Sequence, residues 1–292
     1  MNPPRGLNTL NQIMVPINPP PLPPNLPCGH LIEGSREDYI KICVPLFEAS
    51  IKGDWRAAKS ILEKKPELVR FAITKNFDTP LHIAASAKRT KYVENLLKMM
   101  KSSDLELQNR SYNTSLSLAA TAGDVQIAKI ILGKNKAMLD IPDSQGMMPL
   151  YMAVFFARNE MVRYLYGISN KMSGDLWTNE NRGLVLQKCL EADIFDVAVK
   201  IVNECTQLTS NKRLLRDLLL VLARKTEAFT YNRKTEDITL KSTVKSRFRA
   251  RRETDALRLL RIIWNKISIM PDNEIDQILQ GPPLEIEHGQ HC

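Results

Sequence analysis

The hydrophobic positions of this chain recur at a nearly constant interval. Four short apolar blocks, at residues 44–49, 79–85, 114–120 and 148–153, align on positions 45, 80, 115 and 149. Each block is followed by a second stretch with apolar residues at helical spacing, and these stretches are residues 54–62, 90–97, 124–132 and 158–166. A period of 34 or 35 residues with two amphipathic stretches per period predicts four units of helix, short turn and helix.

The turns between paired helices are part of the same pattern. Gly53-Asp54 and Gly123-Asp124 predict a left-handed glycine followed by an aspartate that caps the next helix. Arg89 and Arg158 stand at the corresponding turns of the second and fourth units, so these two units depart from the pattern.

The connections between units predict hairpin tips. Residues 143–146 include a glycine and indicate a tight turn. At the two earlier tips Phe77 and Tyr112 stand near the position that favours glycine, which leaves the shape of those turns open.

Weaker helical patterns continue beyond the fourth unit. Residues 184–190 and 196–202 indicate a degenerate fifth unit without a proline signal. Residues 214–224 and 254–267 predict two further helices, separated by the polar, basic stretch 231–252. We therefore expect an all-α chain whose repeats are followed by a helical extension.

Proline and charge define the ends of this organisation. Nine of the 17 prolines precede residue 31, a composition that favours an extended, disordered arm. The stretch 224–266 contains 13 Lys/Arg and 5 Asp/Glu, which leaves 28 against 27 for the rest of the chain, so one segment holds nearly all of the formal charge of +9. The expected domains are a disordered arm at 1–36, a repeat domain at 37–210, a helical extension with a basic loop at 211–280, and a disordered tail at 281–292.

Thr79-Pro80-Leu81-His82, together with the period, resembles the ankyrin repeat. Proline at the first helical turn presets φ and needs no donor, while the threonine hydroxyl can cap the helix. The fold class is therefore expected to be an ankyrin-repeat solenoid of four to five repeats. In this interpretation His82 caps and packs, because no partner at ligand spacing would make it a catalytic base or a metal ligand.

Several longer segments resemble a more specific family, the plant ankyrin-repeat proteins of the accelerated-cell-death type. The matching segments are Lys52-Gly53-Asp54-Trp55, Pro66-Glu67-Leu68-Val69, Val93-Glu94-Asn95-Leu96-Leu97, Ala128-Lys129-Ile130, Met161-Val162-Arg163-Tyr164-Leu165-Tyr166, Leu222-Ala223-Arg224-Lys225-Thr226-Glu227-Ala228-Phe229 and Ala256-Leu257-Arg258-Leu259-Leu260. The resemblance covers residues 38–280 and implies roles in defence, cell-death or stress signalling. Family members carry a C-terminal membrane domain called PGG, which this sequence lacks, so only protein binding is carried over.

The sequence predicts an interaction protein without catalysis, cofactor or metal. It has no phosphate-binding glycine loop, no HExxH, no CxxC and no nucleophile elbow. Five irregularly spaced cysteines are typical of reduced thiols. Since no secretory leader or membrane-spanning run is present, we expect a cytoplasmic protein, at the cytoplasmic face of the plasma membrane if it follows its family, with the nucleus as the alternative.

Ankyrin repeats bind protein partners through hairpin tips and the first helices, which form a concave face. Aromatic, methionine and arginine side chains are the usual anchors of such interfaces. The predicted partner-binding residues are Asn76, Phe77, Asp78, Arg110, Tyr112, Gln145 and Met147. The alternative is a nuclear or nucleic-acid-associated regulator whose phosphate contacts come from Lys241, Lys245, Arg247, Arg249, Arg251 and Arg252.

Overall fold

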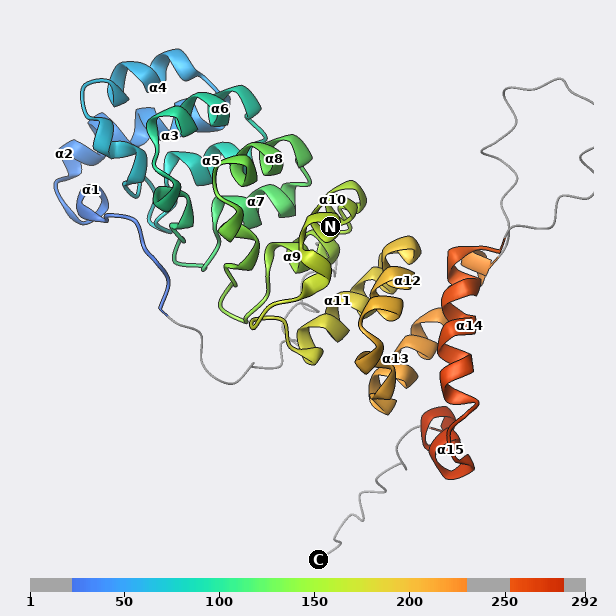
Figure 1. The fold of residues 1–292 in the computed structure, drawn as a ribbon. Coiled ribbons are helices and arrows are strands. Elements are labelled where there is room, and N and C mark those ends of the chain that lie inside the picture. The colour runs from blue at the N-terminus through green and yellow to red at the C-terminus, as the bar shows by residue number, and fades with distance from the viewer. Residues whose placement is uncertain (1–22, 230–252, 281–292) are drawn as a thin grey trace, which may run out of the picture. The chain divides into compact units, whose positions relative to one another are not determined.

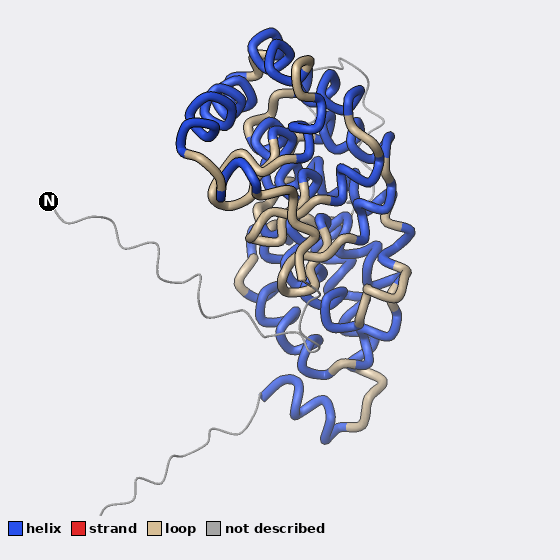
Figure 2. Tube along the Cα trace, turned by 90° about the vertical axis from the view of Figure 1, so that its left-hand side faces the viewer, coloured by secondary structure: helices blue, strands red, loops and turns tan. Residues whose placement is uncertain are grey.

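The structure is a computed structural model that describes residues 23–229 and 253–280. Figures 1 and 2 show helices and loops only among these residues, and one isolated bridge joins Cys28 and Phe71. The all-α prediction is therefore confirmed. The chain divides into two compact units, the first formed by Met1–Asn170 with Gly174–Leu176 and the second by Lys171–Ser173 with Trp177–Cys292.

The first unit contains the four predicted repeats as pairs of antiparallel helices. Its helix pairs are α3 (Val44–Lys52) with α4 (Trp55–Leu62), α5 (Pro80–Ser86) with α6 (Thr90–Met99), α7 (Ser115–Ala122) with α8 (Val125–Lys134), and α9 (Pro149–Phe155) with α10 (Asn159–Ile168). The first helices of the pairs pack side by side in one layer, and the second helices form another layer (Figure 1). Short 3-10 turns follow the second helices at η2 (Pro66–Arg70), η3 (Ser102–Glu106) and η4 (Lys136–Asp140).

The starts of α5 and α7 show why the repeat signature forms a helix here. Thr79 Oγ1 accepts a hydrogen bond from His82 N, and Thr114 Oγ1 accepts one from Ser117 N. The residue-82 and residue-117 side chains in turn accept from the backbone N–H of Thr79 and Thr114. Each pair closes a capping box that satisfies two otherwise free donors, so the predicted capping role of His82 is confirmed.

Ser115 stands where the second and fourth repeats have proline. Its side chain is fully buried, and its hydroxyl has no hydrogen-bond partner. Thr114, which precedes it, is extended at φ −85° and ψ 167°, a conformation that a following proline favours. We expect Ser115→Pro to raise the free energy of unfolding by about 0.4–1 kcal/mol, measured by urea unfolding, because the ring restricts the unfolded chain and removes the unpaired hydroxyl. A decrease would contradict this account of the N1 position.

The turns within repeats are left-handed in all four units. Gly53 and Gly123 have φ values of 76° and 78°, as predicted, and Lys88 and Ala157 adopt φ values of 59° and 51° at the corresponding positions. Asp54 and Asp124 then cap α4 and α8 through their side chains.

Arg89 and Arg158 have a structural task at these turns that the sequence did not indicate. Arg89 Nε donates to the Ile51 carbonyl at 2.7 Å, and Arg158 Nε donates to the Thr121 carbonyl at 2.8 Å. Their aliphatic stems lie against Gly53 and Gly123, where an added Cβ would be 3.0 Å and 2.9 Å from the arginine Cδ. Each arginine therefore covers the glycine of the preceding repeat. It also donates a hydrogen bond to a backbone carbonyl near the C-terminal end of that preceding repeat's first helix.

The second unit repeats the same plan with longer helices. It contains α11 (Asn179–Glu191), α12 (Phe195–Glu204), η6 (Thr206–Ser210), α13 (Lys212–Ala223), η7 (Thr226–Phe229), α14 (Asp255–Ile267) and α15 (Asp272–Gln280). Helix α11 packs on α12 and α13, while α14 packs on α12 and α13. The predicted fifth repeat is thus α11 with α12, and α13 with α14 has the arrangement of one more repeat. The fifth repeat begins at Thr178, whose side chain caps α11 in place of a proline signal.

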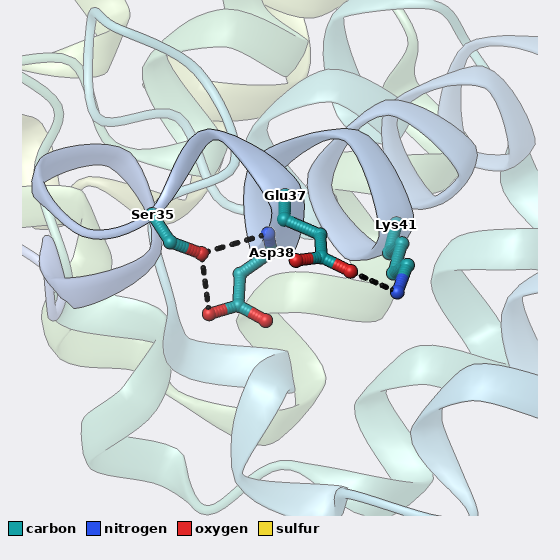
Figure 3. Close-up of polar contacts among 4 residues, drawn as sticks. All are labelled: Ser35, Glu37, Asp38 and Lys41. Atoms are coloured by element: carbon teal, nitrogen blue, oxygen red, sulfur yellow. Dashed lines mark hydrogen bonds and ion pairs between the residues drawn. The ribbon is translucent and has the colours of Figure 1, made fainter.

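The N-terminal segment corrects one prediction. We expected residues 1–36 to be a disordered arm, and residues 1–22 lie outside the described part of the chain. Residues 23–36 are folded, since backbone hydrogen bonds join Asn25 and Cys28 to the loops of the repeats and Leu31 is buried in α1 (His30–Glu33). The chain then enters α2 (Arg36–Asp38) and the π-helical turn η1 (Tyr39–Cys43), which leads into α3. Ser35 caps α2 by accepting from Asp38 N at 3.0 Å (Figure 3).

Candidate protein-binding surface of the repeats

The hairpin tips between repeats share a side-chain acceptor. Thr74 Oγ1 accepts a hydrogen bond from the backbone N–H of Asp78, Asn109 Oδ1 from that of Asn113, and Asp143 Oδ1 from that of Met147. The three acceptors are spaced by 35 and 34 residues, which matches the repeat period. This spacing was visible in the sequence, yet the role of the three residues became clear only from their bonds. Burial raises the pKa of Asp143, while its bonds from the backbone of Met147 and Gln145 oppose that rise.

The left-handed residue of each tip follows three positions later. Phe77 and Tyr112 have φ values of 63° and 59°, and Gly146 has a φ value of 75°. The turn shape that the sequence left open is therefore the same at all three tips. Phe77 and Tyr112 adopt a backbone conformation that costs a non-glycine residue free energy, so other contacts must stabilise these tips.

The predicted partner-binding residues differ in exposure. Phe77 and Met147 are each only 5% exposed, so our prediction that their side chains are exposed anchors is wrong for these two residues. Arg110 is exposed, whereas the remaining predicted residues are half-buried, and these are Asn76, Asp78, Tyr112 and Gln145.

Several of these side chains connect neighbouring tips. Asn109 Nδ2 donates to Asp78 Oδ1 at 2.7 Å, and Ser111 Oγ donates to Asn76 Oδ1 at 3.1 Å. The Arg110 backbone N–H donates to the Asn76 carbonyl, and its guanidinium donates to the Lys75 carbonyl. The tips of the second and third repeats therefore form one connected surface, and the polar groups of Asn76 and Asp78 are already used to build it.

Phe77 is covered by charge and backbone. The Arg110 guanidinium carbon lies 4.1 Å from the centre of the Phe77 ring, within the range of a cation–π contact. Arg110 also lies 4.0 Å from a carboxylate oxygen of Glu33, and Gly29 lies against the ring. The buried state of Phe77 thus depends on residues far from it in sequence, which the local pattern could not reveal.

Two exposed aromatic residues at the C-terminal end of α9 were missed by the sequence analysis, and these are its last residue and its C-cap. Phe155 is 38% exposed and Phe156 is 40% exposed, and their rings meet edge to face at a centroid distance of 5.2 Å. Tyr151 lies 6.0 Å from Phe155 by the same measure. The sequence did offer a signal for this exposed pair, because two adjacent phenylalanines stand at the end of a predicted first helix. Aromatic side chains with this exposure can bury large apolar area against a protein partner.

His82 is buried in a neutral form. Its Nε2 lies 3.0 Å from the Asn113 carbonyl and donates to it, while Nδ1 accepts from Thr79 at 2.7 Å. Burial lowers the pKa of His82, although Asp78 and the backbone carbonyls of Asn113 and Leu107 act in the opposite direction. The imidazole therefore joins two repeats and is not presented to a ligand.

A groove of about 670 Å³ lies along the starts of α8 and α10. Its lining residues are Lys88, Gly123, Asp124, Val125, Lys129, Glu160, Arg163 and Tyr164. Three cations stand against two carboxylates in this lining, and Arg163 pairs with Glu160 at 3.2 Å. No group of His, Cys, Asp or Glu suited to a metal ion is present within residues 23–229 and 253–280.

The buried thiols have raised pKa values. Burial raises the pKa of Cys43 to about 11 and raises those of Cys189 and Cys205 as well. Thiolates are therefore scarce at neutral pH in these three positions, which disfavours nucleophilic or metal-binding roles. His288, His291 and Cys292 near the end of the sequence are of types that can bind a metal ion, and they lie outside the described residues. The basic residues 241–252 also lie outside them.

The comparisons with known proteins agree with the repeat geometry. Residues 81–175 match the family model for ankyrin repeats, in three copies. This range corresponds to helices α5 to α10, the second to fourth repeats of the first unit. Ankyrin repeats are in general protein-interaction units without catalysis.

Curated proteins with similar sequences are diverse in their names. The chain is 36% identical over 80 residues to the nuclear factor NF-kappa-B p105 subunit of Gallus gallus, which covers 27% of this chain and 8% of that protein. It is 29% identical over 108 residues to inversin of Canis lupus familiaris, covering 37% of this chain and 10% of inversin. It is 26% identical over 148 residues to the probable E3 ubiquitin-protein ligase XBOS31 of Oryza sativa subsp. japonica, covering 50% of this chain and 32% of the relative.

These matches cover only a minor part of each relative, so the relatives' whole-protein activities do not transfer with them. None of the described helices is long and apolar enough to cross a bilayer. One architecture explains the repeat period, the helix caps, the left-handed turns and the match to the family model. This chain carries an array of ankyrin repeats within an all-helical fold.

Proposed function

We propose that the protein is a non-catalytic interaction scaffold that holds a protein partner on the exposed surface of its ankyrin repeats. The observation that carries this proposal is the exposed pair of Phe155, the last residue of α9, and Phe156, its C-cap, in the layer of first helices. A pair of aromatic rings exposed on a rigid helix can anchor an interface with little loss of side-chain entropy. The exposed Arg110 at the tip of the third repeat adds a cationic contact.

A site-specific photo-crosslinker tests the proposal and at the same time identifies the partner. A benzoylphenylalanine side chain at position 156 is expected to form crosslinks to a distinct protein in plant cell extract. The control places the same side chain at position 59, an exposed residue on α4 in the layer of second helices. Equal crosslinking at both positions, or none at position 156, would argue against binding at α9.

Once the crosslinked partner is purified, alanine substitution measures how much Phe156 contributes to the affinity for it. We expect Phe156→Ala to weaken its affinity roughly 5–30-fold, or about 1–2 kcal/mol, measured by isothermal titration calorimetry. The matched control is Ile51→Ala, because Ile51 is 41% exposed and stands at a similar position on α3. A loss of equal size for Ile51→Ala would mean that α9 has no special role.

The biological setting follows from the closer resemblance. We infer that the chain acts in defence, cell-death or stress signalling in the cytoplasm of a plant cell. The likeness to a plant ankyrin protein from Oryza sativa supports this setting, together with the segments shared with the accelerated-cell-death type. Disruption of the gene in the source plant, followed by a pathogen and salt challenge, tests it.

The basic residues 241–252 support the alternative of a nuclear or nucleic-acid-associated regulator, because eight cations stand against two carboxylates in residues 230–252. Phosphate binding would weaken steeply as salt rises, whereas binding at the apolar surface of α9 would change little. Replacing the six named cations with glutamine separates the two functions, since only the alternative depends on them.

A further inference from the structure

An N-terminal segment is paired with the loops of two repeats in the manner of an added strand. The Cys28 carbonyl accepts from the Ala72 backbone N–H at 2.9 Å, and the Asn25 carbonyl accepts from the Gln108 backbone N–H at 2.8 Å. The Asn25 backbone N–H donates in return to Gln108 Oε1 at 3.2 Å. We call residues 25–33 the N-terminal strap, and it bridges the second and third repeats.

Side chains give this pairing selectivity. A Cβ added at Gly29 would lie 2.7 Å from Cζ and 2.8 Å from Cε1 of the Phe77 ring, so only glycine fits without a shift. Further along the strap, a carboxylate oxygen of Glu33 lies 4.0 Å from the Arg110 guanidinium. The same guanidinium lies over the Phe77 ring. The loops therefore accept a backbone that pairs with them up to residue 28, then a glycine at the start of a helical turn and, four residues after the glycine, an acidic side chain at the end of that turn.

The C-terminal end of the strap is held more firmly than its N-terminal end. Beyond it, Ser35 caps α2 by two hydrogen bonds with Asp38, and Glu37 pairs with Lys41 (Figure 3). At its first residue, the contacts of Asn25 with Gln108 and Glu106 are hydrogen bonds that are exposed or only partly buried. Among residues 25–33 only Pro27 and Leu31 are buried, far fewer than in the helices of the repeats, so the strap can open at a lower free energy than the repeats themselves.

We propose that the edge formed by residues 71–72 and 106–108 is a binding site for a peptide that pairs along this edge and turns into a short helix after a glycine, and that the N-terminal strap occupies it in cis. A second peptide of the same chemistry, with glycine against Phe77 and a carboxylate against Arg110, binds when the strap is displaced. This inference goes beyond the scaffold function at α9 and does not depend on it, because its ligand is a segment of this chain. A tethered segment has an effective concentration in the millimolar range, so the closed strap excludes a weak competitor.

Hydrogen exchange on the full chain tests whether the strap closes the site. Gly29→Val should increase exchange at the Ala72 and Gln108 amides at least tenfold, since both donate to the strap. The Ile73 and Asn109 amides are matched controls, because they donate to the Asp78 and Asn113 carbonyls within their own hairpins. Unchanged control amides show that the variant remains folded.

Glu33→Lys provides a second route to the same opening, because it reverses the ion pair with Arg110 without adding a steric clash. The Ala72 and Gln108 amides should again exchange faster, by a smaller factor. Unchanged exchange at these two amides in both variants would overturn the proposal.

A labelled synthetic peptide of residues 23–36 then tests binding in trans by fluorescence anisotropy. We expect the Gly29→Val chain to bind the peptide at least tenfold more tightly than the unmodified chain, whose own strap competes. A peptide carrying Gly29→Val is the control and should not bind. Failure of the opened chain to bind the natural peptide, or equal binding of both peptides, would refute the site.

Discussion

Replacing Leu116 with alanine should lower the free energy of unfolding by about 2–5 kcal/mol. Leu116 is completely buried in α7, which packs between α5 and α9. The substitution removes three heavy side-chain atoms and leaves a cavity that neighbouring helices can fill only in part. Because each repeat is stabilised by its neighbours, the loss should destabilise the second and fourth repeats as well as the third.

Urea unfolding followed by circular dichroism measures this change. Ile51→Ala removes comparable apolar volume from a side chain that is 41% exposed on α3, and it should change the free energy of unfolding by less than about 0.5 kcal/mol. If Leu116→Ala and Ile51→Ala had equal effects, the stacked arrangement of first helices would be wrong.

Stability should also fall as the pH is lowered below about 6.5, in part because of His82. Burial lowers the pKa of His82 below its ordinary value of 6.5 in the folded chain. The unfolded chain therefore binds more protons between these two pKa values, and the contribution of His82 is complete only above pH 6.5. One proton corresponds to a slope of at most about 1.4 kcal/mol per pH unit within that window.

A matched variant isolates this effect from the other titrating groups. His82→Ser copies Ser117, which closes the capping box of the third repeat without a titrating ring. We expect urea unfolding between pH 7.5 and pH 5.5 to show a smaller loss of stability in His82→Ser than in the natural chain. Identical pH dependence in the two proteins would show that His82 does not titrate differently on unfolding.

The helices of the repeats could be predicted because their signals are local and periodic. Pro80 and Pro149 open helices at N1, Gly53 and Gly123 close first helices, and the apolar positions return at a fixed interval. Helix α15 was missed, since it combines a short length with a polar composition and depends on packing against α13.

The binding surface was harder to predict because it depends on contacts between distant residues. Phe77 has the composition of an exposed anchor, but Arg110 and Gly29 cover it. Residues 25–29 have the composition of a disordered arm, but their backbone pairs with two loops through groups that every residue type carries. Side-chain identity therefore carries little information about this pairing, with the exception of Gly29.

The alternation of glycine and arginine at the inner turns has a consequence for how such an array can change in length. Arg89 of the second repeat covers Gly53 of the first, and Arg158 of the fourth covers Gly123 of the third. Deleting one repeat would leave a glycine without its arginine or an arginine without its glycine, whereas deleting the second and third together would bring Arg158 to Gly53 and restore the contact. Duplication and loss in this lineage should therefore proceed most easily in steps of two repeats, about 70 residues at a time.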